Sequence, residues 1–202
     1  LPYLHLSKVH FEFLIIQNQI FHETTLFVLV SKSFKTQETL TNGKTIKKWF
    51  IEKTNIDAVS KHFVAVSNNL KQTKGFGISS DKIFPMNDWV GGRFSLWSSA
   101  GITITLAIGP NNFQELLNGA QEIDYHFKTA KFKDNIPKIL AMIGIWYTNF
   151  WNAETEAIVP YTEYLKSLPA YLQQSVMESN GKSVNREGEK INYQTSPIIW
   201  GA

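Results

Sequence analysis

Two hydrophobic patterns alternate along this chain, and they predict strands and helices in turn. Residues 24–30 (Thr-Thr-Leu-Phe-Val-Leu-Val) and 61–67 (Lys-His-Phe-Val-Ala-Val-Ser) are continuous, β-branched and aromatic, as buried parallel strands are. Shorter strands are predicted at residues 82–85, 157–161 and 197–200, the last of them buried. Strands that alternate with helices are typical of an α/β protein with a parallel sheet.

Helices are predicted between these strands. Apolar positions give residues 37–50 a partial inner face, and Pro137 falls in the first turn of another helix, where proline is tolerated. The break at residues 109–112 (Gly-Pro-Asn-Asn) predicts a domain boundary, with residues 1–108 on one side and 109–202 on the other. We expect Asn111 or Asn112 to cap the helix that follows. The predicted helices cover residues 37–50, 96–108, 113–127, 135–150 and 165–174, with a short helix or turn at 68–73.

Composition narrows the class of protein. A length of 202 residues allows one large domain or parts of two. The residues are 43% hydrophobic and 18% charged, an ordinary globular composition that can form a core. The net charge of +3 comes from scattered residues, so we expect no nucleic-acid partner. We see no signal peptide and no apolar run that could span a bilayer, so no membrane association is expected. The absence of cysteine excludes disulfides and a thiol nucleophile and fits a cytoplasmic protein.

The histidine and aromatic residues that lie among apolar positions are interpreted as structural residues and not as metal ligands or ligand-binding groups. His5 and His10 are interpreted as packing or surface groups, and no metal site is expected. Residues 145–151 (Ile-Trp-Tyr-Thr-Asn-Phe-Trp) are interpreted as a packed helix rather than a platform on which ligands stack.

The loop at residues 31–36 (Ser-Lys-Ser-Phe-Lys-Thr) is the first candidate site. It follows a predicted buried strand and precedes a predicted helix. The free N–H groups and the positive end of such a helix favour phosphate, and ligands of α/β sheets bind beyond the carboxyl ends of the strands. Alternatively, the hydroxyls merely cap the helix.

Two further stretches carry candidate chemistry. Residues 88–101 (Asp-Trp-Val-Gly-Gly-Arg-Phe-Ser-Leu-Trp-Ser-Ser-Ala-Gly) place two glycines, which allow close approach to the main chain, before a permanently charged arginine. Taken alone, these residues are also typical of an ordinary turn with a surface arginine. Residues 173–182 (Gln-Gln-Ser-Val-Met-Glu-Ser-Asn-Gly-Lys) contain Glu178, a candidate base that is also typical of a solvated helix end.

All three stretches, in this order and with this spacing, resemble the glucose-6-phosphate isomerases. Residues 123–127, 144–150 and 197–201 extend the similarity over nearly the whole chain. The resemblance implies an α/β fold of the sugar-isomerase (SIS) type, a three-layer sandwich with parallel sheets, of which the chain holds portions of two domains. It also implies a cytoplasmic homodimer that interconverts glucose 6-phosphate and fructose 6-phosphate through a cis-enediol, in glycolysis and gluconeogenesis, without a cofactor.

The same resemblance assigns roles to residues. Glu178 would shuttle the proton, Arg93 would stabilise the enediolate, and Gly92 would let the sugar come close. Gln174, one helical turn before Glu178, would also face the sugar. Ser33 and Lys35 stand where the family usually has threonine. The loop would hold the sugar phosphate and contains Ser31, Lys32, Ser33, Phe34, Lys35 and Thr36.

Some family elements are not found in the sequence. They are an upstream Gly-Ile-Gly-Gly-Ser loop, the ring-opening histidine, and a C-terminal signature with a catalytic lysine. The chain therefore resembles the middle of a family member, and we expect it not to turn over glucose 6-phosphate alone. A non-catalytic phosphosugar-binding regulatory module and an interaction protein are the alternative hypotheses. Glu178 argues against the first, because a sensor needs no base.

Overall fold

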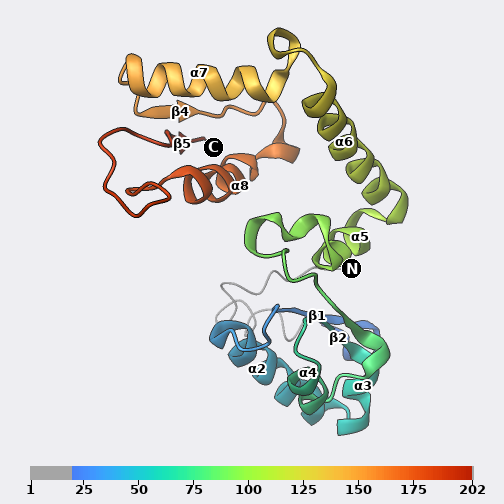
Figure 1. Cartoon of the computed structure of the whole chain (residues 1–202). Coiled ribbons are helices and arrows are strands. Elements are labelled where there is room, and N and C mark those ends of the chain that lie inside the picture. Colours follow the sequence, from blue (N-terminus) through green and yellow to red (C-terminus); the bar gives the residue numbers. More distant parts are fainter. Residues whose placement is uncertain (1–19, 202) are drawn as a thin grey trace. The chain divides into compact units, whose positions relative to one another are not determined.

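The structure, a computed structural model, describes residues 20–201 and forms two compact units. The first extends to Phe113 and the second begins at Gln114 (Figure 1). His5 and His10 lie outside the described residues. The assignment of residues 1–108 and 109–202 to two sugar-isomerase domains stays a prediction.

A three-stranded parallel sheet forms the centre of the first unit. Its order is β1 (Phe27–Val30), β2 (Phe63–Val66) and β3 (Ile83–Phe84), with Phe27 opposite Phe63 and Ala65 opposite Ile83. The helices of this unit, in chain order, are η1 (His22–Thr24), α2 (Gln37–Lys53), η2 (Ile56–Ala58), α3 (Val59–His62), α4 (Leu70–Phe76), η3 (Ser80–Lys82), η4 (Gly92–Trp97), η5 (Ser99–Gly101) and α5 (Ile102–Ile108).

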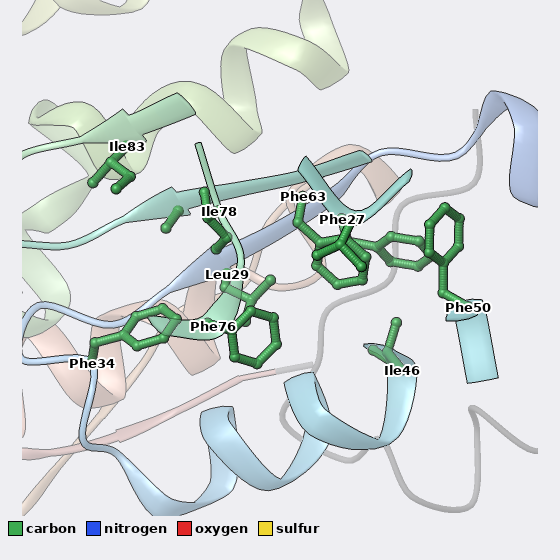
Figure 2. Close-up of a cluster of buried hydrophobic side chains, with 11 residues drawn as sticks. Phe27, Leu29, Phe34, Ile46, Phe50, Phe63, Phe76, Ile78 and Ile83 are labelled. Carbon is green, nitrogen blue, oxygen red and sulfur yellow. The ribbon is translucent and has the colours of Figure 1, made fainter. Parts of the chain in front are cut away.

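The core of this unit is an aromatic cluster between the sheet and α2 (Figure 2). The rings of Phe27 and Phe63 stack with centroids 4.8 Å apart, and Phe50 meets both edge-on at 5.6 Å. Gly43 lets α2 approach the sheet, since an added Cβ would lie 2.7 Å from a methyl carbon of Leu29. Large apolar side chains buried in one place are the main stabilising element of such a unit.

The predicted strands of the first unit form, but they are shorter than predicted. The first strand was predicted to begin at Thr24, but Thr24 ends the 3-10 helix η1, in which its backbone N–H bonds to the carbonyl of Phe21. Strand β1 therefore begins only at Phe27. The predicted helix at 96–108 is also only partly correct. Its first half consists of the 3-10 helices η4 and η5, and a regular α-helix begins only at Ile102.

The second unit contains a two-stranded parallel sheet of β4 (Thr155–Ala157) and β5 (Ile198–Trp200). The π-helical turn η8 packs on β5, where the side-chain amide of Gln173 donates to the carbonyl of Ile199 at 2.9 Å. The helices that complete the unit are α6 (Pro110–Thr129, which begins in the first unit), η6 (Phe132–Asp134), α7 (Ile136–Phe150), η7 (Glu163–Leu165), α8 (Leu168–Leu172) and η8 (Gln173–Glu178).

Several boundaries in this second half differ from the prediction. Helix α6 starts at Pro110, so Asn111 and Asn112 lie inside its first turn and do not cap it. The strand predicted at 157–161 lies at 155–157, and Pro160, which has no N–H to donate, lies beyond its end. In β5 only Ile199 is buried, at 3% exposure, so the prediction of a buried strand is correct for one residue.

Helix α7 confirms the predicted helix but not its predicted packing. Trp146 and Phe150 stack on each other at 5.1 Å, and they are 53% and 68% exposed. Only Thr148 is buried in this helix.

The predicted α/β class with parallel sheets is confirmed. Among residues 20–201, no helix combines the length and the apolar character needed to cross a bilayer.

Candidate functional site

The loop of residues 31–36 joins the carboxyl end of β1 to α2, as predicted. Phe34 fixes the loop to the core: its side chain is 1% exposed and meets the Phe76 ring edge-on at 5.8 Å. Its φ of 49° is in the left-handed region, where non-glycine residues are uncommon. The Phe34 side chain therefore anchors the loop, and only its backbone can face a ligand.

The hydroxyl groups of this loop do not cap α2. Thr36 is the N-cap residue, yet its side chain makes no cap hydrogen bond. Its Oγ1 lies instead 3.1 Å from the Oγ of the buried Ser31. The first N–H groups of a helix have no intrahelical acceptor, so the start of α2 keeps donors that an anion can use.

Lys32 connects this loop to the stretch that leads to Arg93. Its Nζ donates to the backbone carbonyl of Asp88 and, at 2.8 Å, to that of Val90. The carboxylate of Asp88 accepts in turn from the amide of Asn68 at 3.3 Å. Lys32 therefore holds two site segments together, a contact that the resemblance did not predict.

A second loop, residues 67–69, supports the first and was missed by the sequence analysis. The Ser67 hydroxyl donates to the carbonyl of Lys32 at 3.1 Å. The side-chain amide of Asn69 donates to the carbonyl of Ser33 at 2.9 Å. Their position in the sequence could have indicated this role. Three polar residues directly follow the buried strand β2, and the carboxyl end of β2 lies beside that of β1.

The Gly-Gly-Arg motif opens η4. Gly92 has a φ of 53°, in the left-handed region, whereas Gly91 is fully extended at −176°. Only Gly92 therefore has a backbone angle that favours glycine. Arg93 is half-buried, and its Cζ lies 5.5 Å from the centre of the Phe94 ring.

Glu178 and Gln174 lie on η8 in the second unit, and both are exposed. The helix that starts at α8 continues through Glu178 as a π-helical turn, a rare conformation that is frequent at functional sites. The backbone N–H of Ile199 on β5 bonds to the sulfur of Met177 at 3.3 Å, and Lys182 Nζ donates to the Glu178 carbonyl at 2.7 Å. These contacts hold the side chain of Met177 against β5 and the backbone carbonyl of the candidate base.

The predicted site residues thus fall into two sets. The loop of residues 31–36, Gly92 and Arg93 belong to the first unit, where Lys32 ties the loop to the segment that precedes Arg93. Gln174 and Glu178 belong to the second unit, one turn apart on η8. Within the part of the chain that the structure describes, no three histidine or acidic side chains converge as metal ligands.

Comparison with known proteins places these features in a family. The family model described as phosphoglucose isomerase matches residues 9–202. The glucose-6-phosphate isomerase of Christiangramia forsetii is 59% identical over 179 residues, which cover 89% of this chain and 33% of that protein. The enzyme of the same name from Buchnera aphidicola is 56% identical over 180 residues, with the same coverage.

A solved structure agrees with these relatives. The crystal structure of a glucose-6-phosphate isomerase from Chlamydia trachomatis has a TM-score of 0.84 and 39% sequence identity. It matches 93% of this chain, which corresponds to 36% of that protein. The chain therefore spans about a third of the length of the curated relatives it matches.

Proposed function

The chain belongs to the phosphoglucose isomerase family, and from this premise we propose that it provides the phosphate loop and the catalytic base of an enzyme that interconverts glucose 6-phosphate and fructose 6-phosphate. The observation that carries the proposal is the open start of α2, where the Ser31–Thr36 hydroxyl pair leaves the helix uncapped. That arrangement suits a phosphate monoester. The family match supplies the sugar that carries it.

In this proposal the sugar phosphate binds at residues 31–36. The first N–H groups of α2 donate to the phosphate oxygens, and the positive end of the helix favours their charge. The exposed side chains of Ser33, Lys35 and Thr36 add donors and positive charge, whereas Lys32 acts mainly by holding the loop to residues 88–90. Phe34 contributes its backbone.

The proton transfer needs a base and a group that stabilises negative charge. We assign the base to Glu178, which takes a proton from one sugar carbon and returns it to the neighbouring carbon. Arg93 stabilises the enediolate oxygen with its fixed positive charge. Gly92 has no side chain to block the sugar, and the space where its Cβ would stand is open to 4 Å. Gln174 lies on the same helical segment as Glu178 and contacts the sugar.

We further propose that the enzyme is a cytoplasmic homodimer of glycolysis and gluconeogenesis that needs no cofactor. A helix that is apolar on every side is normally buried, and α7 exposes Trp146, Tyr147 and Phe150. Their exposure supports burial of α7 in the assembled enzyme. The substrate also supports a cytoplasmic location, because a doubly charged hexose phosphate does not cross a bilayer unaided and stays in the compartment where it is made.

A chimaera tests the proposal. These residues replace the aligned segment of the Christiangramia forsetii enzyme, which supplies the remaining two thirds of the protein. We expect isomerase activity, and we expect Glu178→Gln to lower kcat by at least about 100-fold. The matched control is Glu187→Gln, an exposed glutamate of the same unit outside the candidate site. Equal activity of both variants would overturn the role of Glu178.

A further inference from the structure

The loop of residues 67–69 (Ser-Asn-Asn) contacts both parts of the candidate site in the first unit. It follows β2, the strand that lies between β1 and β3 in the sheet. The chain that leaves β1 forms the loop of residues 31–36, and the chain that leaves β3 leads through residues 86–90 to Arg93. Because the three strands are parallel, all of these segments start from the same edge of the sheet.

Asn69 uses both ends of its side-chain amide. Its Nδ2 donates to the backbone carbonyl of Ser33 at 2.9 Å, and its Oδ1 accepts from the backbone N–H of Gln72 at 3.1 Å. The second bond makes Asn69 the N-cap of α4. A carbonyl can only accept and a backbone N–H can only donate, so the two partners fix the orientation of the amide. Asn69 therefore ties the middle of the phosphate loop to the start of α4.

Asn68 connects the phosphate loop to the segment that leads to Arg93. Its Oδ1 accepts from the backbone N–H of Met86 at 2.6 Å, and its Nδ2 donates to the carboxylate of Asp88 at 3.3 Å. Its own backbone N–H donates to the carbonyl of Lys32 at 2.9 Å. One residue thus bonds to both parts of the site.

Ser67 holds this loop in place. It is fully buried, and its backbone N–H donates to the carbonyl of Phe84 on β3 at 2.9 Å. Its Oγ accepts from the backbone N–H of Asn69 at 3.1 Å and donates to the carbonyl of Lys32 at 3.1 Å. Asn68 and Asn69 are half-buried, where hydrogen bonds are stronger than in water. The two asparagines therefore act from a fixed base.

We propose that Asn69 and Asn68 are positioning residues for the isomerisation, an inference that rests on the proposed function. Asn69 holds the Ser33 backbone in the orientation that presents the phosphate loop to the sugar phosphate. Asn68 holds residues 86–88, and through them places Arg93 relative to the bound phosphate. Neither side chain touches the sugar. Because small displacements of site groups are costly, Asn69 acts on KM and Asn68 on kcat.

Two substitutions of Asn69 separate positioning from helix capping. Asn69→Ser keeps a good N-cap residue for α4 but has no Nδ2 to reach Ser33, whereas Asn69→Ala lacks both groups. In the chimaera, we expect both variants to raise the KM for fructose 6-phosphate at least about fivefold, with kcat changed less than about twofold. A raised KM in Asn69→Ala alone would overturn the positioning role in favour of capping, and an unchanged KM in both would also overturn it.

Asn55→Ser is the matched control for Asn69→Ser. Asn55 is an exposed asparagine of the same unit that caps η2 by accepting from the backbone N–H of Ala58, and it lies outside the candidate site. We expect this variant to keep both kinetic constants. A change in KM as large as that of Asn69→Ser would contradict a specific effect of Asn69 on the phosphate loop.

A reversed pair tests Asn68. Asn68→Asp keeps the acceptor for the Met86 N–H but sets a second carboxylate against that of Asp88, so we expect kcat to fall at least about fivefold, with a smaller change in KM. Adding Asp88→Asn restores one donor and one acceptor with their places exchanged, and we expect this double variant to recover most of the lost kcat. An unchanged kcat in Asn68→Asp, or no recovery in the double variant, would contradict the role of Asn68.

Amide hydrogen exchange of the complete 202-residue chain gives a readout that needs no activity. We expect residues 31–38 to exchange at least about threefold faster in Asn69→Ser than in Asn55→Ser, and residues 40–53 of α2 to exchange equally in both. An inactive chimaera would refute the proposed function, and this exchange would still decide whether Asn69 orders the loop. Equal exchange of residues 31–38 in the two variants would overturn the positioning role of Asn69.

Discussion

At the scale of single residues, the two glycines before Arg93 differ in their backbone φ angles. Gly92 has a φ of 53°, whereas Gly91 is extended. A Cβ meets no atom within 4 Å at either position, so backbone strain alone separates them. We expect Gly92→Ala to lower the free energy of unfolding by about 1–2 kcal/mol. Gly91→Ala should change it by less than about 0.5 kcal/mol. Urea denaturation of both variants checks this, and equal losses would refute the assigned strain.

Substitution of Thr36 distinguishes a loop that binds an anion from a loop whose hydroxyl caps α2. Because its side chain makes no cap bond, Thr36→Ala should cost less stability than the typical loss of about 1 kcal/mol for an N-cap. The same change should raise the KM for fructose 6-phosphate in the chimaera about tenfold, since one charge-assisted hydrogen bond is lost. Steady-state kinetics measures this. An unchanged KM with a lowered free energy of unfolding would indicate a cap instead.

Asp81 provides a pH-dependent prediction in the turn before β3. The hydroxyl of Ser79 donates to its carboxylate, and this bond, followed by a backbone bond and the charge of Lys82, lowers the pKa of Asp81 below its ordinary value of 3.8. The ionised carboxylate therefore favours the folded state above pH 3.8, and this contribution is lost as pH falls through the lowered pKa. Ser79→Ala should raise the pKa of Asp81 in a carbon-13 NMR titration. An unchanged titration would exclude the hydroxyl as the cause.

At the scale of elements, Asn135 joins two long helices. Its side chain is fully buried, donates to the carbonyls of Phe127 and His126 at 2.9 and 3.4 Å, and accepts from the N–H of Lys138 at 3.2 Å. The amide thus ends α6 and starts α7. Asn135→Ala removes the cap and the bond to the partly buried carbonyl of Phe127, so we expect a loss of about 1–2 kcal/mol.

The unfolding of this part of the chain can be followed by amide hydrogen exchange of residues 110–150. Asn112→Ala is the matched control, because its exposed amide donates only to a carbonyl of the adjacent turn. A similar small loss for both variants would contradict the role of Asn135 as a joint.

The sequence predicted elements wherever a local pattern decides the structure. The aromatic and β-branched runs located β1 and β2, and the strand–loop–helix order located residues 31–36. It could not predict contacts between segments distant in the chain. Lys32 was expected to bind phosphate, yet its Nζ bonds to carbonyls at residues 88 and 90, more than 50 residues away. The π-helical turn at Glu178 also escaped, because no residue type specifies it.

Helix α7 shows the limit of hydrophobicity as a guide to burial. Its apolar composition predicted a packed helix, and the helix forms with Asn135 as its N-cap and proline in its first turn. Burial depends on what lies against the helix, however, and the described chain covers little of it. Composition therefore predicted the element but not its partner.

At the scale of the whole molecule, the candidate site residues are divided between two units. The first holds residues 31–36 and Arg93, and the second holds Glu178. The chain also spans about a third of the length of its curated relatives. The proposed chemistry therefore needs both units in one assembled enzyme. Substitutions at Arg93 and Glu178 should then both act on turnover, while substitutions in the loop act mainly on KM.

The most direct test of the proton transfer follows the hydrogen itself. Glucose 6-phosphate labelled with deuterium at C2 is converted by the chimaera, and the deuterium released to water is measured by NMR. A glutamate that carries the proton exchanges part of it with solvent. We therefore predict release of deuterium by the chimaera and release at least about 100-fold slower by its Glu178→Gln variant. Full retention of deuterium at C1 of the product, or undiminished release by the Glu178→Gln variant, would contradict Glu178 as the exchanging base.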